Sequence, residues 1–206
     1  QKDVIFNDLR LAVVDEQHRF GVRQRLELGQ KGQSVDVLVM TATPIPRSLA
    51  LAQYGDMDVS VLDEKPPGRK PIATALVSSG RIDEVVAKLR SAITDGRQIY
   101  WVCPLVEESE LSDLTAAEDR FKRLRAALGD EAVGLVHGQM PAAEKDLAMQ
   151  RFQAGETNLL VATTVIEVGV NVPNATIMVI ERAESFGLAQ LHQLRGRVGR
   201  GDQQST

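Results

Sequence analysis

The sequence contains little sulfur and few aromatic side chains. Among its 206 residues there is one cysteine, Cys103, and Phe, Trp and Tyr together make up 4%. A single cysteine cannot form a disulfide within the chain, which argues against a disulfide-stapled secreted scaffold and favours a cytoplasmic setting. No stretch approaches the roughly 20 apolar residues of a membrane-spanning helix, and no signal peptide opens the chain. We therefore expect a cytoplasmic protein without a membrane partner.

An excess of basic residues is also missing. The chain has 24 Lys and Arg against 28 Asp and Glu, which gives a net charge of −4. This balance argues against a uniformly basic coat for nucleic acid, although a channel that binds nucleic acid can concentrate arginine locally. A hydrophobic content of 43% and a charged content of 25% are typical of a globular protein.

Short apolar segments alternate with helical ones along the chain, which predicts an α/β fold with a mostly parallel sheet. We expect strands at residues 11–14, 35–40, 59–62, 72–77, 98–102, 132–136, 158–162 and 176–180. We expect helices at residues 22–31, 82–93, 114–128, 141–154 and 188–198, and one that begins with Thr43 as N-cap and Pro44 at its first position.

A proline-rich stretch interrupts this alternation. Residues 63–71 contain three prolines and a glycine, which suit neither a helix nor a central strand. We therefore predict one domain at residues 1–63, a linker at residues 64–71 and a second domain at residues 72–206. The first domain has few predicted strands, and the chain opens with Gln1 rather than Met, so we expect a piece of a longer protein with a partial first domain and a nearly complete second one.

Two adjacent carboxylates, Asp15 and Glu16, end the first apolar strand, at the position where open α/β sheets bind ligands. Asp15 suits a Mg²⁺ ion held through water, and Glu16 suits the activation of an attacking water molecule. A solvated acidic turn also explains the pair, and for two carboxylates alone it is the better explanation. His18 lies nearby but lacks further ligands at the spacing of a metal site.

Hydroxyl side chains follow two other strands. Thr41 follows the strand at residues 35–40, from which it could reach the carboxylates of the first strand, whereas Thr43 is explained by its role as a helix cap. Thr163 and Thr164 follow the strand at residues 158–162. They could donate to a nucleic-acid phosphate or cap an ordinary turn, and both alternatives stay open.

His137 and Gly138 follow the strand at residues 132–136, where a nucleic-acid contact and an ordinary turn are equally good explanations. The strand at residues 98–102 holds Tyr100 and Trp101, which we expect in the core rather than against bases. Cys103 follows them, and we expect a buried thiol there.

The segment Gln-Leu-Arg-Gly-Arg-Val-Gly-Arg, residues 193–200, is the most informative. On a helix, Gln193, Arg197 and Arg200 fall on one face, at spacings of four and seven residues. Arginine suits bidentate phosphate contact and the neutralisation of charge in phosphoryl transfer. A solvated basic helix end explains the arginines but not the two glycines, each of which costs about 1 kcal/mol in a helix. We therefore favour a functional role, in which the glycines permit a close approach.

Together, these segments resemble the motors of superfamily 2 helicases, and within them the RecG family. The matching stretches are residues 15–22, 41–47, 100–110, 134–140 and 159–201. The transcription-repair coupling translocases are similar but have Glu at the place of Gln17, so this residue favours RecG.

The resemblance implies two RecA-like domains that close on ATP and Mg²⁺, with double-stranded or branched DNA running across them. It implies a monomeric motor that remodels stalled forks and recombination intermediates, in contact with other domains of a full-length protein. Its implied catalytic residues are Asp15, Glu16, Gln193, Arg197 and Arg200, and Gly169 and Asn171 join Asp15, Glu16 and the arginines at the nucleotide. The implied coupling residues are Gln17, His18, Thr41, Thr43 and Glu167, and the implied DNA contacts are His137, Gly138, Thr163 and Thr164.

Two departures from the family pattern stand out. The chain has no Gly-x-x-x-x-Gly-Lys-Ser/Thr loop to hold phosphate, so we expect no useful ATP hydrolysis from these residues alone. Asn171 stands where relatives usually have Asp, and its amide can hydrogen-bond but carries no charge. Two alternatives remain: a non-catalytic RecA-like module that binds DNA or a partner, and a metal-dependent nuclease or phosphatase built on Asp15, Glu16 and His18.

Overall fold

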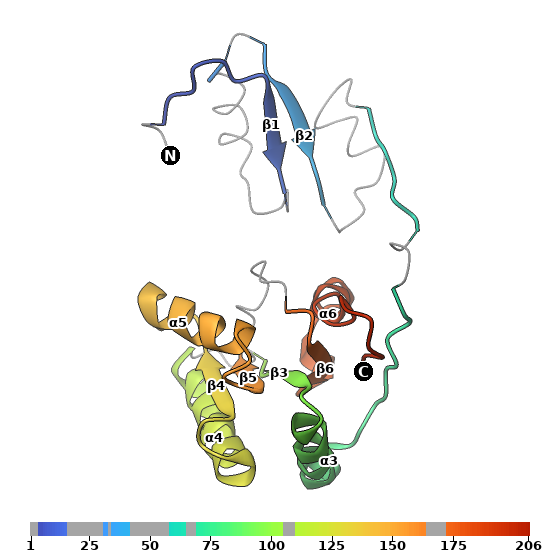
Figure 1. Cartoon of the computed structure of the whole chain (residues 1–206), viewed down its shortest axis with the longest axis vertical. Coiled ribbons are helices and arrows are strands. Elements are labelled where there is room, and N and C mark those ends of the chain that lie inside the picture. The colour runs from blue at the N-terminus through green and yellow to red at the C-terminus, as the bar shows by residue number, and fades with distance from the viewer. Residues whose placement is uncertain are drawn as a thin grey trace. The chain divides into compact units, whose positions relative to one another are not determined.

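The computed structural model describes residues 4–15, 31–32, 34–41, 58–64, 69–104, 110–163 and 172–206. The chain divides into two compact units, Gln1–Val61 and Leu62–Thr206, which are described separately (Figure 1). Residues 65–68 of the predicted linker lie outside the described ranges, and the linker assignment stays a prediction. The helices predicted at residues 22–31 and from Thr43 also lie outside these ranges, apart from Lys31.

The first unit contains a parallel pair of strands, β1 (Leu11–Val14) and β2 (Asp36–Val39). In β1 the side chains of Ala12 and Val14 are buried, whereas those of Leu11 and Val13 are exposed, which is the alternation of a strand covered on one face. The two strands predicted here are therefore confirmed. The strand predicted at residues 59–62 is wrong, because these residues have no regular structure and the side chain of Leu62 is 95% exposed.

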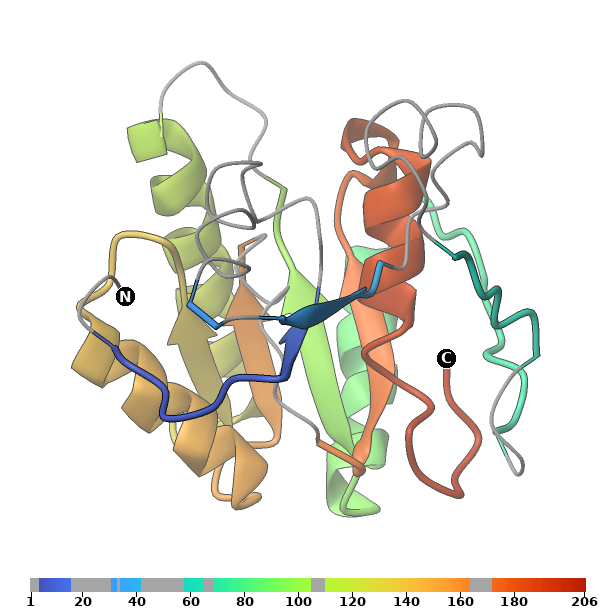
Figure 2. The same ribbon diagram turned by 90° about the horizontal axis from the view of Figure 1, so that it is seen from above.

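The second unit is built around a four-stranded parallel sheet (Figure 2). Its strands are β3 (Gln98–Val102), β4 (Val133–Val136), β5 (Leu159–Ala162) and β6 (Ala175–Ile180), in the spatial order β4-β5-β3-β6. The helices are α3 (Ile82–Thr94), α4 (Glu110–Leu128), α5 (Ala142–Gln153) and α6 (Leu188–Arg195), with short 3₁₀ turns at Ser79–Arg81 and Ala183–Ser185. The α/β class with parallel sheets flanked by helices is thus confirmed.

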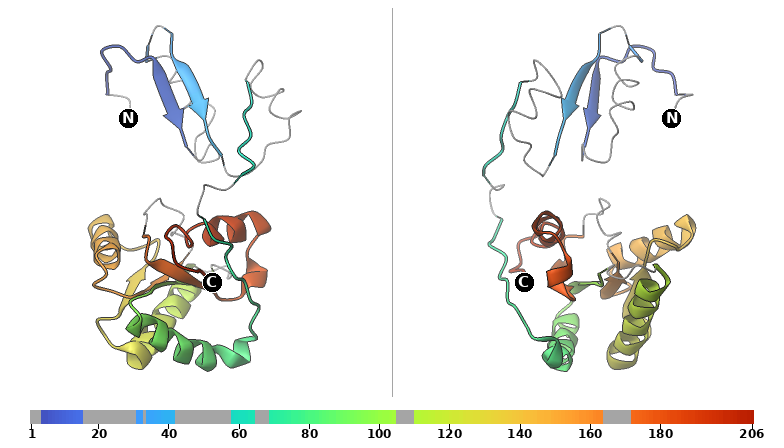
Figure 3. Two further views of the ribbon diagram at one scale, coloured as in Figure 1. Left: turned by 45° about the vertical axis from the view of Figure 1, so that its right-hand side comes forward. Right: turned by 180° about the vertical axis from the view of Figure 1, so that it is seen from behind.

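Helices cover both faces of this sheet, and two apolar clusters result (Figure 3). Ile99 and Trp101 of β3 pack with α3 and α4, whereas Tyr100 and Val102 pack on the opposite face with α5 and α6. All five residues of β3 are buried, as expected for a central parallel strand covered on both faces. Tyr100 and Phe152 are in ring contact, with centroids 5.0 Å apart. The predicted core positions of Tyr100, Trp101 and Cys103 are confirmed.

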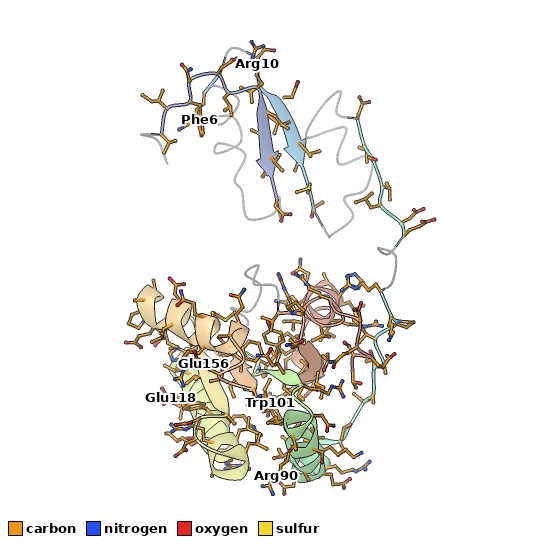
Figure 4. The ribbon with its side chains drawn as sticks, viewed as in Figure 1. Phe6, Arg10, Arg90, Trp101, Glu118 and Glu156 are labelled. Atoms are coloured by element: carbon orange, nitrogen blue, oxygen red, sulfur yellow. The ribbon has the colours of Figure 1, made fainter. Side chains whose placement is uncertain are left out.

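The two helices on the first face are also joined directly. Arg90 of α3, which is labelled in Figure 4, donates to the carbonyl oxygen of Ala127, near the end of α4, at 2.5 Å. A cation at this end satisfies a carbonyl group that has no partner within the helix and complements the helix dipole. No helix among the described residues is long and apolar enough to span a membrane.

Most elements of the second unit lie within one residue of their predicted bounds, although α4 begins four residues earlier than predicted, at Glu110. The strand predicted at residues 72–77 is wrong. These residues have no regular structure, and the side chain of Leu76 is 95% exposed. Ala73 donates its backbone N–H to the carbonyl oxygen of Ser205 at 2.9 Å, but no ladder of hydrogen bonds follows among the described residues. Ile72 packs against the apolar cluster around Tyr100, but the segment does not join the sheet as a strand.

Candidate functional site

In the first unit, two predicted site residues lie at one edge of the sheet. Asp15 follows β1 and Thr41 follows β2, and the parallel register pairs Val14 with Val39, so both residues lie beyond the carboxyl ends of their strands. Both are exposed. An exposed carboxylate at this edge fits a Mg²⁺ ion bound through water, because hard cations prefer oxygen ligands.

The partners predicted for these residues cannot be placed, because Glu16, Gln17, His18 and Thr43 lie outside the described residues. Among the residues that the structure does describe, no group of three His, Cys, Asp or Glu side chains could hold a metal ion. A direct protein cage for a metal is therefore absent from the described part of the chain, whereas a single water-mediated carboxylate contact needs no such cage.

In the second unit, the carboxyl edge of the sheet brings His137 and Thr163 together. β4 and β5 are in register, with Val136 opposite Ala162, so the next residue of each strand lies at the same edge. Thr163 donates its N–H to the carbonyl oxygen of Val136 at 3.3 Å, and its side chain is almost completely buried. The Nδ1 atom of His137 is buried and has no hydrogen-bond partner among the described residues.

The turn after β4 also carries a cation that the sequence analysis missed. Lys145, in the first turn of α5, donates from Nζ to the carbonyl oxygen of Gly138 at 2.6 Å. The helix starts at Pro141 as N-cap, so Lys145 lies one turn above it, where its side chain can reach back to the turn. The spacing between Pro141 and Lys145 is the feature of the sequence from which this contact could have been predicted. Thr164, Glu167, Gly169 and Asn171 lie outside the described residues.

The helix predicted at residues 188–198 ends earlier than expected. α6 stops at Arg195, and Gly196 forms its C-cap. The N–H of Arg197 bonds to the carbonyl oxygen of Leu194 at 2.9 Å, a three-residue spacing that tightens the chain beyond the helix. Gly199 then has a φ of +73°, which ends any helical path.

The predicted helical face of Gln193, Arg197 and Arg200 is therefore wrong, because only Gln193 lies in the helix. Residues 196–200, which we call the arginine loop, carry the other two side chains. Arg200 donates from Nε to the carbonyl oxygen of Gly196 at 3.1 Å, so the loop folds back on the helix end.

The loop is fixed by buried apolar side chains in the loop itself and in the last turn of α6. Leu194 and Val198 are buried in the core with Tyr100, whereas Gln193 and Arg197 are half-buried and Arg200 is exposed. Arg197 lies between these two anchors in sequence. The structure thus holds the backbone of the arginine loop against the core and leaves Arg200 at the surface.

The loop is a site of concentrated positive charge. Partial burial, and then the charges of Arg197 and Arg69, lower the pKa of Arg200 from its ordinary value. Burial raises the pKa of Tyr100 to about 12, although the charges of Arg197 and Arg200 act in the opposite direction. The neighbouring positive charges that lower the pKa of Arg200 also favour the binding of an anion, which relieves their repulsion.

Arg69 is a further residue of this site that the sequence analysis placed in the linker. Its Nη2 atom donates to the carbonyl oxygens of Gly196, at 3.3 Å, and Val198, at 3.4 Å. No local pattern indicates this contact, because 127 residues separate Arg69 from Gly196.

Near the carboxyl end of β6, a second cluster has a structural role. Glu181 accepts hydrogen bonds from Arg120, at 2.6 and 3.0 Å, and from the indole N–H of Trp101. The guanidinium of Arg120 also lies 5.4 Å from the ring centroid of Trp101. Burial, and then the charge of Glu181, raise the pKa of the Cys103 thiol to about 12, so this cysteine is a neutral core residue and a poor nucleophile.

Comparison with known proteins places this geometry in a family. Residues 82–202 match the helicase conserved C-terminal domain. The ATP-dependent DNA helicase RecG of Escherichia coli O157:H7 is 57% identical over 206 residues, which cover 98% of this chain and 30% of that protein. The RecG of Acidithiobacillus ferridurans is 56% identical, with coverage of 100% and 30%. The chain belongs to the RecG-type superfamily 2 helicases. It spans about 30% of the length of these curated RecG relatives.

Solved structures agree with this assignment. A RecG bound to a three-way DNA junction superposes with a TM-score of 0.75 at 50% identity, and the match covers 98% of this chain and 26% of that one. Saccharomyces cerevisiae Dbp5 bound to RNA and ADP BeF3 has a TM-score of 0.68 at 16% identity, over 95% and 51% of the two chains, and supports the RecA-like fold alone. The RecG-type relatives do not favour the transcription-repair coupling alternative.

Proposed function

We propose that this chain is part of an ATP-dependent DNA helicase that remodels branched DNA, such as stalled forks and recombination intermediates. The observation that carries the proposal is the identity of 56–57% to RecG helicases over essentially the whole chain. The likeness to a RecG bound to a three-way junction supports branched DNA as the substrate. A cytoplasmic location and action as a monomer belong to the same proposal.

At the nucleotide, Asp15 holds Mg²⁺ through water, and Glu16 orients and deprotonates the attacking water. Mg²⁺, when bound, offsets the negative charge of the phosphates. Gln193, Arg197 and Arg200 contact the γ-phosphate, while Gly169 and Asn171 contact the nucleotide. The concentration of positive charge around Arg200 supports this role, because binding a polyphosphate requires cations close to its phosphate groups.

We assign coupling and DNA contact to residues that follow strands in the sequence. Thr41 and Thr43, with Gln17, His18 and Glu167, link hydrolysis to movement. His137, Gly138, Thr163 and Thr164 contact the DNA backbone, and the ammonium of Lys145 lies at the same turn. The shared edge of His137 and Thr163 supports this grouping. Contacts of this kind position DNA without reading its sequence.

The test is DNA-stimulated ATP hydrolysis by the full-length protein. We expect Glu16→Gln and Arg197→Ala each to lower turnover by about 100-fold or more, because the first removes the base and the second removes a charge that stabilises the transition state. Arg151→Ala is a matched control, since Arg151 is an exposed arginine of α5 that pairs with Glu156. If both site variants keep wild-type turnover, the assignment of the site is wrong.

A further inference from the structure

A segment that follows the proline-rich stretch lies along the arginine loop. Residues 69–73, which we call the strap, have no regular structure but are bonded to the chain around the loop at several points. Arg69 donates to two carbonyl oxygens of the loop, at 3.3 and 3.4 Å. Arg195, the last residue of α6, donates back to the carbonyl oxygen of Ile72 at 3.4 Å.

Residues beyond the loop hold the other end of the strap. Gln204 donates from Nε2 to the carbonyl oxygen of Pro71 at 2.6 Å. The backbone N–H of Ala73 donates to the carbonyl oxygen of Ser205 at 2.9 Å. These bonds run in both directions between the two segments, so the strap and the chain at residues 195–205 restrain each other.

Side-chain packing adds to these hydrogen bonds. A Cβ atom placed on Gly199 would lie 3.2 Å from Cγ1 of Ile72, which is closer than an ordinary contact. The strap therefore backs directly onto the peptide next to Arg200. This close approach agrees with the predicted reason for a glycine in this segment.

The place of Arg69 is electrostatically unusual. The carbonyl oxygen of Gly196 accepts hydrogen bonds from both Arg69 and Arg200, so two guanidinium groups meet at one oxygen atom. Their like charges oppose this arrangement. The carbonyl groups at a helix C-terminus favour a nearby cation, which offsets part of the repulsion. Placing Arg69 as a third cation next to Arg197 and Arg200 therefore costs more electrostatic free energy than placing a neutral donor there. Restraint of the arginine loop is a benefit that can offset this cost.

We propose that Arg69 is a positioning residue for Arg197. The two carbonyl groups that Arg69 holds belong to Gly196 and Val198, the residues immediately before and after Arg197, so the bonds of Arg69 fix the backbone on both sides of it. The inference rests on the proposed role of Arg197 at the γ-phosphate.

The test uses the full-length protein and a double-mutant cycle of Arg69→Ala and Arg197→Ala, with steady-state ATP hydrolysis measured over a range of ATP concentrations and with DNA present. We expect Arg69→Ala to lower kcat about 10-fold and to change KM for ATP less than threefold. In the Arg197→Ala background we expect Arg69→Ala to have no further effect, because its target is gone. Arg69→Lys should recover part of kcat, since an ammonium can hold one carbonyl group but lacks the guanidinium fork.

The control is Lys70→Ala, which removes the exposed neighbouring cation and should leave kcat unchanged. The proposal is overturned if Arg69→Ala leaves kcat unchanged, as Lys70→Ala should, or if it raises KM without lowering kcat. It is also overturned if Arg69→Ala lowers kcat by the same factor in the Arg197→Ala background as in the wild-type protein. A folding defect of Arg69→Ala would appear as a lowered unfolding midpoint. In that case, the double-mutant cycle with Arg197→Ala is made with Arg69→Lys instead. If Arg197→Ala alone has no effect, the proposed function fails instead.

Discussion

At the scale of single residues, Gly199 combines two constraints in one position. Its φ of +73° lies in the left-handed region, and a side chain there would press against Ile72. Gly155 has a similar φ of +77° but open space around the position of a Cβ atom. A comparison of alanine substitutions at the two glycines therefore distinguishes the effect of backbone strain from that of steric contact.

We predict that Gly199→Ala lowers the free energy of unfolding by about 2–3 kcal/mol, whereas Gly155→Ala lowers it by about 1 kcal/mol. The larger loss reflects the contact with Ile72 in addition to the strained φ. Urea unfolding of the purified variants measures both values. Equal losses would show that the strap does not press on Gly199.

Cys103 makes stability depend on alkaline pH. Burial holds its pKa near 12, whereas an exposed thiol ionises near pH 9. Because the folded pKa is the higher one, the stability that the neutral buried thiol provides is complete below pH 9 and is lost as pH rises from 9 towards 12. Tyr100, raised from 10 to about 12, adds a similar loss that begins one unit higher.

Replacing Cys103 with alanine should remove its share of this loss. We predict that the wild-type protein loses more unfolding free energy between pH 8 and pH 10.5 than Cys103→Ala does, because only the wild type has a thiol that ionises on unfolding. The measurement is the urea midpoint at both pH values. An identical fall in the two proteins would contradict a buried, neutral thiol.

At the scale of elements, an ion pair ties α4 to the end of β6. Arg120 and Glu181 have side chains that are 18% and 20% exposed, and the carboxylate also accepts from Trp101 of β3. Removing one partner of such a pair leaves an uncompensated charge in a poorly solvated place. The pair Arg81 and Glu84 has similar geometry but is more than half exposed.

We predict that Glu181→Gln lowers the free energy of unfolding by about 3 kcal/mol. Glu84→Gln is the control, and it should produce no measurable change because solvent screens an exposed pair. Chemical denaturation of the two variants provides the comparison. A loss for Glu181→Gln as small as that of the control would mean that α4 and β6 do not depend on this pair.

The strands at the centre of the second unit could be predicted because burial on both faces gives them short, continuous apolar runs. The same rule is wrong at residues 59–62 and 72–77, whose apolar side chains lie largely at the surface or against a loop. The end of α6 was missed because glycine at 196 and 199 was interpreted as a tolerated helical residue, whereas Gly199 adopts a positive φ.

The candidate site could also be predicted only in part from the sequence. The carboxyl edges of parallel strands follow from topology, so the grouping of His137 with Thr163, and of Asp15 with Thr41, could be predicted from the sequence. Arg69 could not, because its contact with Gly196 depends on tertiary structure across 127 residues. Its neighbours in sequence indicate only a break in regular structure.

At the scale of the whole molecule, the residues that we propose to act on the nucleotide are divided between the two units in sequence. Asp15 and Glu16 belong to the first unit, and Gln193, Arg197 and Arg200 belong to the second. Neither set contains both the proposed base and the proposed γ-phosphate arginines. The proposal therefore requires residues of both units for hydrolysis, which is the property that a nucleotide-driven motor needs.

The most direct test of the central proposal is unwinding of a three-way DNA junction by the full-length protein. We predict that the wild-type protein separates the strands only when ATP and Mg²⁺ are present. Glu16→Gln should still bind the junction but leave it intact, because the attacking water is no longer activated. Unwinding by Glu16→Gln at the wild-type rate, or no unwinding by the wild-type protein, would contradict the account.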